Sequence, residues 1–173
     1  MMGSLWTRMV RPRPSNPAPT PLPVDSANRH RAEVLAMRLD HAGLCSASRA
    51  DRLNGLGIHC CGDLLTVDLG QVAAAFGSPR RALRSLRRYR QSVRLAASIN
   101  QMGVRDAILL VTIHRRDPVA LSNGSAGLLH RDLVRLAEST VGQRLYRGRR
   151  PPSIRRLRRW ITEAQTAAQM ANA

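Results

Sequence analysis

The sequence predicts an all-α fold, and three observations support this prediction. Aromatic residues make up only 3% of the chain, so the core must come from Leu, Ala, Val and Ile, which favours close-packed helices. Alternating runs of β-branched residues, which would indicate strands, are nearly absent. The best strand candidate, Ile108 to Ile113, follows a helical period, and we predict a buried helix there. A chain of 173 residues suffices for one domain or for two small ones packed together.

Residues 1–24 are expected to form a disordered, Pro/Arg-rich tail. This segment holds most of the ten prolines and no helix-forming run, so it should be extended. A proline-rich docking peptide and a basic arm lying on nucleic acid are alternatives for it. The segment lacks the continuous apolar stretch of a signal peptide, and its prolines disfavour the amphipathic helix of a mitochondrial transit peptide.

A first unit, residues 25–101, is predicted to start with a helix. Asp25 or Ser26 is a suitable N-cap, and the helix should run to about His41. Further helices are expected at about 47–54, shortly after Ile58, and at 69–76, where Asp68 is the cap and Gly77 the end.

The clearest helix is predicted from Pro79 to about Asn100. Ser78 can cap it, and Pro79 suits its first position because proline lacks the N–H that would go unpaired there. One apolar stripe contains Leu83, Leu86, Tyr89, Val93 and Ala97. The remaining surface is mostly arginine, without any acid: Arg80, Arg81, Arg84, Arg87, Arg88, Arg90 and Arg94. Arginines four positions apart repel each other by roughly 0.2–0.5 kcal/mol per pair, which indicates that an anion relieves the repulsion.

Gly103 is expected to end this basic helix, and a second unit, residues 102–173, to follow. Its helices are predicted at 104–112, from Asp117-Pro118, at 128–138, at 141–146 and from Ser153 to about Met170. A faint repeat of about 55 residues relates the units, and in it Ile58 corresponds to Ile113 and His59 to His114. Two packed copies would bury faces that one short unit could not.

Residues 42–65 predict a helix-hairpin-helix-like unit. Glycine lets a backbone turn tightly beside a phosphate, and the N–H groups that start the next helix then point at the anion. Gly43 and Leu44 lie at the expected turn, with Leu44 as a core plug. The polar residues just downstream are Ser46, Arg49 and Arg52. Cys45 stands where a second glycine is usual, which weakens the phosphate site.

The next glycine pair, Gly55 and Gly57, could form the hairpin instead. We interpret it as the turn leaving the second helix, because Asn54-Gly55 is a favourable helix end and the apolar residues around it can plug the core. Helix packing without any nucleic acid stays an alternative role for both turns.

A second arginine cluster lies near the C-terminus, again without an acid inside it. Its members are Arg144, Arg147, Arg149, Arg150, Arg155, Arg156, Arg158 and Arg159. Trp160 and Tyr146 are close in sequence and could stack on a base or on an arginine. The alternative is a solvated charged face with Trp160 in the core.

Two stretches resemble the bacterial domain-of-unknown-function family four-three-three-two. They are AGLCSASRADRLNGLGIHCCGDLL, with Gly43-Leu44, Gly57-Ile58 and Asp63-Leu64, and VGQRLYRGRRPPSIRRLRRWITEAQ, with Gly142-Gln143-Arg144 and Trp160-Ile161. The resemblance covers about Arg31 to Ala164 and implies tandem helix-hairpin-helix-like units, from which Cys45 is a departure. It implies no activity.

The sequence offers no support for an enzyme, a cofactor or a metal. None of the phosphate-binding, dinucleotide-binding, hydrolase or metalloprotease motifs occurs. His41, Cys45, His59, Cys60 and Cys61 lack the CxxC spacing of a zinc site, and we expect buried reduced thiols in the cytoplasm instead. No apolar run is long enough to cross a bilayer.

The composition therefore favours a non-enzymatic binding protein. The formal charge is +17, and all 28 basic residues are arginine, a bias that genome composition alone could produce. Such a surface attracts polyanions. We expect nucleic-acid binding through phosphates without strong sequence preference, with DNA favoured over RNA and no membrane or small-molecule substrate. The expected contacts are Gly43, Leu44, Ser46, Arg49, Arg80, Arg84, Arg87, Arg88, Arg155, Arg156 and Arg159. The alternatives are an adaptor that binds a protein partner and a ribosome-associated RNA binder.

Overall fold

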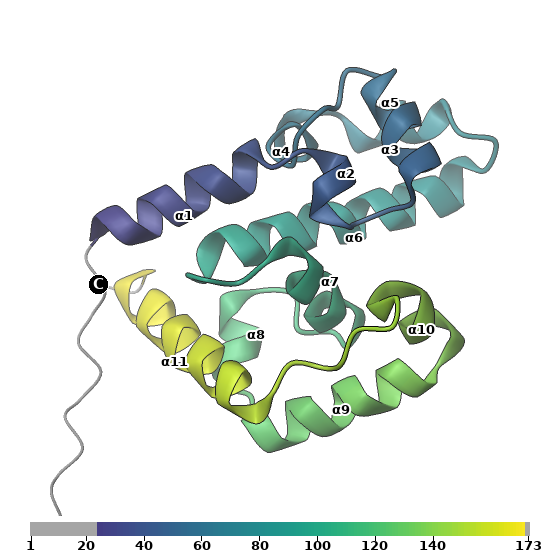
Figure 1. Cartoon of the computed structure of the whole chain (residues 1–173). Helices are drawn as coiled ribbons and strands as arrows, with labels where there is room; N and C mark the ends of the chain where they lie inside the picture. The colour runs from purple at the N-terminus through teal and green to yellow at the C-terminus, as the bar shows by residue number, and fades with distance from the viewer. Residues whose placement is uncertain (1–23, 172–173) are drawn as a thin grey trace, which may run out of the picture.

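The computed structural model describes residues 24–171, and within them the fold is all-α as predicted, with 11 helices and no strand. The helices are α1 Val24–Ala36, α2 Leu39–Ala42, α3 Ala47–Asn54, α4 Asp63–Thr66, α5 Leu69–Ala74, α6 Pro79–Ser98, α7 Val104–Thr112, α8 Pro118–Ser122, α9 Ala126–Glu138, α10 Thr140–Tyr146 and α11 Ile154–Ala171. In Figure 1, α6 crosses the middle, with α1 to α5 on one side and α7 to α11 on the other. The predicted disordered tail lies outside the described residues, apart from Val24. None of the described helices is both long and apolar enough to span a membrane.

The first helix differs from the prediction at both ends. α1 already contains Asp25 and Ser26, so the predicted N-cap there is wrong, and the helix stops at Ala36 rather than near His41. The break arises because a distant segment pairs with the chain here. Cys61 N–H donates to Met37 O and Gly62 N–H to Leu35 O, both at 2.8 Å, and Arg38 forms an antiparallel bridge with Cys60.

Both predicted turns are confirmed, and in the second one Gly57 is the residue with the left-handed conformation. Gly43 ends α2 with φ +65°. At the end of α3, Ile58 N–H donates to Leu53 O and Gly57 N–H to Asn54 O, both at 3.0 Å, which is the paired corner called a Schellman motif. Gly57 has φ +80°, whereas Gly55 stays helical at −64°, so Gly55 is not the turn residue.

The same corner recurs at the end of α7. Arg115 N–H donates to Leu110 O at 2.9 Å and His114 N–H to Val111 O at 3.1 Å, with His114 at φ +65°. His114 therefore corresponds to Gly57, and the predicted pairing of His114 with His59 is wrong by two residues. The relation between two repeated units stays a prediction.

α7 passes through the centre of the molecule. Residues Asp106 to Val111 are all at most 6% exposed, so the predicted buried helix is confirmed. α6 ends at Ser98, and Gly103 is the N-cap of α7, so the prediction that Gly103 ends the basic helix is wrong. The buried side chains of both halves form one continuous core, and a division at residues 101 and 102 stays a prediction.

Two local features of the second half are a capped helix start at α8 and a close approach of α10 to α9. Asp117 accepts a hydrogen bond from Ala120 N–H at 2.8 Å, and Pro118 takes the first helical position, as predicted. α10 approaches the end of α9 at Gly142, where an added Cβ would lie 1.6 Å from Leu136 O. Only glycine fits this approach without a backbone shift, because the obstructing atoms belong to the main chain.

Candidate nucleic-acid interface

One side of α6 belongs to the core, and its arginines occupy the remaining sides. Leu86, Tyr89 and Val93 are at most 4% exposed and anchor the helix. Because side chains on one helix face recur every three or four residues, the intervening arginines point outward. Three of the predicted contacts are exposed and one is half-buried: Arg80, Arg84 and Arg87, and then Arg88.

An open groove of about 440 Å³ lies between α6 and the end of α7, and we call it the α6 groove. It is lined by Arg84, Arg87, Arg88, Gln91, Val111, Thr112, His114 and Arg116. Three predicted contacts thus meet Arg116, which the sequence reasoning had not selected. None of the lining residues is acidic, and Arg116 Nη2 lies 3.2 Å from His114 Nδ1. Arg80 does not line this groove.

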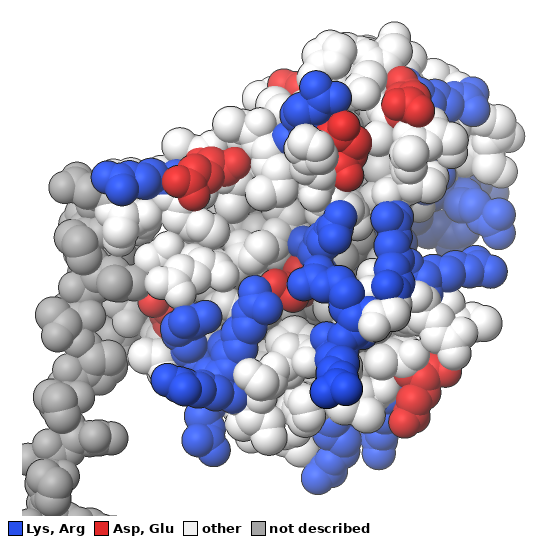
Figure 2. Space-filling view, in the orientation of Figure 1, with Lys and Arg blue, Asp and Glu red and all other residues white. Residues whose placement is uncertain are grey.

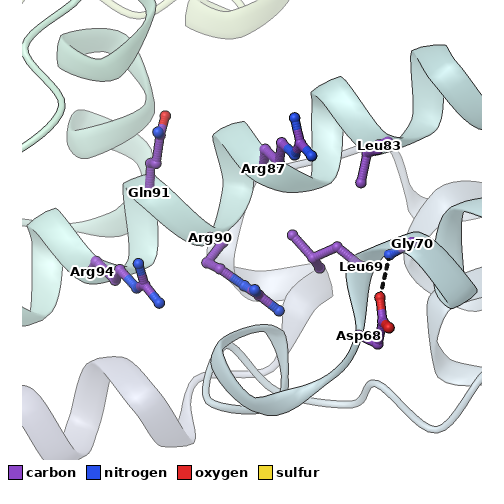
Figure 3. Close-up of a pocket in the computed structure, with 8 residues that line it drawn as sticks. All are labelled: Asp68, Leu69, Gly70, Leu83, Arg87, Arg90, Gln91 and Arg94. Atoms are coloured by element: carbon purple, nitrogen blue, oxygen red, sulfur yellow. Dashed lines mark hydrogen bonds between the residues drawn. The ribbon is translucent and has the colours of Figure 1, made fainter.

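A second hollow, of about 530 Å³, lies on the α5 side of the same helix (Figure 3). Arg87 and Gln91 line both hollows, so the two form neighbouring parts of one surface. Arg90 points toward the α4–α5 connection and donates to Leu64 O at 2.6 Å and to Val67 O. Burial lowers the pKa of Arg90, and Arg94 nearby lowers it further. Arg90 is therefore a structural residue that ties α6 to α4.

The predicted hairpin contacts are mostly engaged inside the protein. Leu44 is 4% exposed and plugs the core as expected. Arg49 donates to Tyr89 Oη at 3.3 Å and lies beside Phe76. Ser46 precedes α3 and is exposed, but its hydroxyl lies 3.3 Å from Ser48 Oγ and does not cap the helix. Gly43 is overlain by the side chain of Arg105, which reaches across from α7.

The C-terminal cluster separates into exposed and structural members. Arg155 and Arg159 are exposed on α11. Arg156 instead bonds Asp106 Oδ2 at 2.7 Å and lies 4.9 Å from the ring centre of Trp160. Burial raises the pKa of Asp106, and Arg156 opposes that rise. The structure brings Arg156 to a buried ion pair, so its guanidinium is only partly free for phosphate.

The aromatic residues of this region are core residues. Trp160 is fully buried, Tyr146 is 4% exposed, and Tyr146 donates to Leu133 O at 3.1 Å. Burial raises the pKa of Tyr146 to about 12. The expectation that these two rings stack on a base is therefore wrong, whereas stacking on an arginine is confirmed for Trp160 by Arg156, and Trp160 lies in the core as the alternative had it.

Four further arginines gather around the Gly43 turn, and we call them the turn patch. They are Arg105, Arg147, Arg149 and Arg150, all exposed. Arg147 donates to Cys45 O at 3.0 Å, and the other three line a shallow hollow beside Tyr146. Figure 2 shows basic side chains gathered over the middle of this face, where Figure 1 places the α2–α3 turn, α7 and the segment after α10. The sequence hint was the Arg147–Arg150 run, whereas nothing local linked Arg105 to Gly43.

The cysteines do not add a metal centre to this surface. Cys61 is buried, and burial raises the pKa of its thiol to about 12. Cys45 and Cys60 are half-buried, and all three are free thiols. Within residues 24–171, no group of three or more histidine, cysteine or acidic residues is arranged to hold a metal ion.

Few of these arginines have a carboxylate partner. Between the described side chains there are two ion pairs, Arg38 with Asp40 at 3.1 Å and Arg156 with Asp106 at 2.7 Å. The arginines of the α6 groove and the turn patch belong to neither pair. Their charge is therefore available to an external anion.

The fold and these surfaces define a class of protein: all-helical, built from helix-hairpin-helix-like units, with arginine-rich surfaces on which few arginines have a carboxylate partner. Residues 39–167 match the family described as Domain of unknown function (DUF4332), and the chain belongs to that family. The match confirms the resemblance carried by the Gly43 and Gly57 turns and by the closing segment. Comparison with curated proteins and with solved structures found no match.

Proposed function

We propose that this protein binds nucleic acid through phosphate contacts, without strong sequence preference. The observation that carries the proposal is the convergence of four arginines on the α6 groove, none of whose lining residues is acidic. A guanidinium fork stays charged at every physiological pH and matches the oxygens of a phosphate. The formal charge of +17 adds long-range attraction for a polyanion.

The length of the arginine row suits several consecutive phosphates. The exposed arginines of this row, Arg84, Arg87 and Arg94, extend over about 15 Å at 1.5 Å per residue, and Arg90 between them is structural. Phosphates on one strand follow at intervals of about 3.4 Å along the duplex axis. Contacts of this kind position a protein on the backbone and carry no direct sequence information, so we expect little discrimination among duplex sequences.

The aromatic residues support duplex DNA over single strands. Single-stranded nucleic acid is commonly held by bases stacked on exposed aromatic rings. Among the described residues, Tyr89, Tyr146 and Trp160 are buried, and Phe76 is half-buried beside Arg52, whose guanidinium lies 4.8 Å from the ring centre. No fully exposed ring of this kind remains in the described part of the chain. The proposal assigns no catalytic activity, and it places the protein in the cytoplasm, which suits free cysteines.

Titration of labelled duplex DNA, single-stranded DNA and RNA at two salt concentrations tests the proposal. If the four groove arginines each meet one phosphate, the logarithm of the binding constant should fall with the logarithm of salt at a slope of about −3.6 on duplex DNA. The variant R84Q/R87Q/R116Q should lower this slope in magnitude by about 3, because each arginine contributes about one unit. The loss of binding affinity in this variant should be equal for duplexes of unrelated sequence.

A matched control carries the same charge change elsewhere. Arg31, Arg131 and Arg135 are exposed, and they line neither the α6 groove nor the second hollow beside it. The variant R31Q/R131Q/R135Q should therefore keep nearly the wild-type salt slope. Equal losses in both variants would show that net charge, not the groove, governs binding. If no nucleic acid binds even at low salt, the proposal fails, and an adaptor role with a protein partner becomes the working hypothesis.

A further inference from the structure

We infer that the turn patch is a second polyanion site, and that one molecule holds two duplex segments at once. The inference rests on the proposed function of the α6 groove and adds a separate site to it. The second ligand is of the same chemical class, the phosphate backbone of a nucleic-acid duplex.

The turn patch is held in place by contacts within the protein. Arg147 is anchored to the Cys45 carbonyl at 3.0 Å, and Arg105 packs across Gly43. Arg149 and Arg150 line the hollow that Arg105 also lines. Two chain segments that are distant in sequence thus bring four exposed guanidinium groups to one surface at the Gly43 turn. Figure 2 shows basic side chains gathered in the middle of the visible face.

The acid closest to this patch does not neutralise it from outside. Asp106 is only 6% exposed, and Arg156 already bonds its Oδ2 at 2.7 Å. Among the described side chains none of the four patch arginines forms an ion pair, although Asp106 lines the same hollow and its charge interacts with Arg149. The patch therefore has four arginines and, unlike the α6 groove, one neighbouring carboxylate, which is buried and already bonded to Arg156.

The two surfaces lie at opposite ends of α7. Arg105 is in the first turn of this helix, whereas His114 and Arg116 follow its last turn. Arg105 and Thr112 are seven positions apart along α7, which corresponds to about 10 Å, and His114 lies beyond that end of the helix. Asp106 to Val111 are buried between them, and the two hollows share no lining residue. Because the core separates the patches, each faces its own ligand.

A bridging experiment tests this arrangement. The full-length protein is mixed with a duplex fixed to beads and with a fluorescent duplex that cannot anneal to it. We expect the wild type to retain the fluorescent duplex on the beads. R105Q/R149Q/R150Q and R84Q/R87Q/R116Q should each still bind one duplex but lose this retention. Arg147 is left unchanged because it holds the Cys45 carbonyl.

Two controls accompany the bridging experiment, once melting curves show that each variant is folded. R31Q/R131Q/R135Q, with the same charge change, should retain bridging. An equimolar mixture of the two patch variants should not bridge, and bridging by that mixture would overturn the claim that one molecule holds both segments. A wild type that binds one duplex without retaining a second would overturn the inference and leave the proposed function standing. Absence of any duplex binding would overturn both the inference and the proposed function.

Discussion

Arg105 lies directly across Gly43, so that a Cβ on this glycine would be 2.0 Å from Arg105 Nε. The second half of the chain thus supplies the cation that overlies the turn of the first half. Glycine is favoured at this position by its φ of +65°, and a Cβ here would in addition push the Arg105 side chain aside. A hairpin that looks complete in the sequence is finished by a residue more than sixty positions away.

Gly43→Ala should therefore destabilise the fold more than Gly57→Ala. Both positions have positive φ, which costs a non-glycine residue roughly 1–2 kcal/mol, but a Cβ at Gly57 meets nothing within 4 Å. Gly77 has neither constraint and provides a neutral control. Urea denaturation of the three alanine variants measures the order. Equal losses at Gly43 and Gly57 would mean that Arg105 moves aside without cost.

His114→Gly should stabilise the protein. His114 occupies the left-handed position of the α7 corner at φ +65°, where the corresponding residue of the first unit is Gly57. Relief of the backbone strain should raise the free energy of unfolding by about 1 kcal/mol. Thermal melting compares the variant with wild type. A lower melting temperature would indicate that the contact between His114 and Arg116 outweighs the strain.

Asp63→Ala should lower stability at neutral pH and much less in acid. The Asp63 carboxylate accepts hydrogen bonds from Cys60 N–H and His59 N–H, both at 2.8 Å, and these bonds hold its pKa below the ordinary 3.8. A lowered folded-state pKa contributes stability above the unfolded value that is lost as pH falls through the folded value. We expect a loss of about 1 kcal/mol at pH 7, typical of such a capping carboxylate.

Denaturation of wild type and of Asp63→Ala from pH 7 down to below 3.8 checks this, and the two stabilities should converge at the acid end. Asp51→Ala, which removes an exposed carboxylate from α3, is the control for the loss of one negative charge. If the difference in unfolding free energy between wild type and Asp63→Ala stayed constant with pH, the loss of stability would not come from the ionised carboxylate.

Trp160→Ala should cost about 3–5 kcal/mol, the range for truncating a large core aromatic. Trp160 is fully buried on α11, but its indole Nε1 has no hydrogen-bond partner in the structure. Trp160→Phe should therefore cost clearly less, because it removes a buried N–H that is not satisfied. Denaturant titrations of both variants give the comparison. A phenylalanine variant as unstable as the alanine one would point to a partner for Nε1.

Elements with local signals were predicted well from the sequence. α7 matches its predicted bounds, and α8 begins at Asp117-Pro118, because capping and proline geometry act within a few residues. The break after Ala36 was missed because its cause is the pairing with residues 60–62. The turn after α3 was predicted at residues 55–58, but the sequence could not show which of its two glycines takes the left-handed conformation, because both suit a helix end.

The candidate interface was predicted only in part, again because local signals are visible in the sequence and contacts between distant segments are not. Periodicity showed that α6 carries outward arginines, since one helix has one apolar stripe. It could not show that Arg116 and His114 meet them across a groove, or that Arg105 reaches Gly43. It also could not separate Arg155 from Arg156, because the buried partner of Arg156 lies fifty residues away. Contacts between distant segments follow from tertiary packing and leave no local pattern.

Because α7 lies between the two basic surfaces, we expect the α6 groove and the turn patch to unfold together rather than separately. The buried residues of α7, Asp106 to Val111, touch the core that both halves share. Fraying of this helix would expose that core and release Arg105 together with His114, so neither surface can melt alone. The backbone amides of α7 should then exchange with heavy water only through global unfolding and be the slowest in the described chain. If the proposed sites bind nucleic acid, a ligand at either one should slow that exchange without contacting the buried amides.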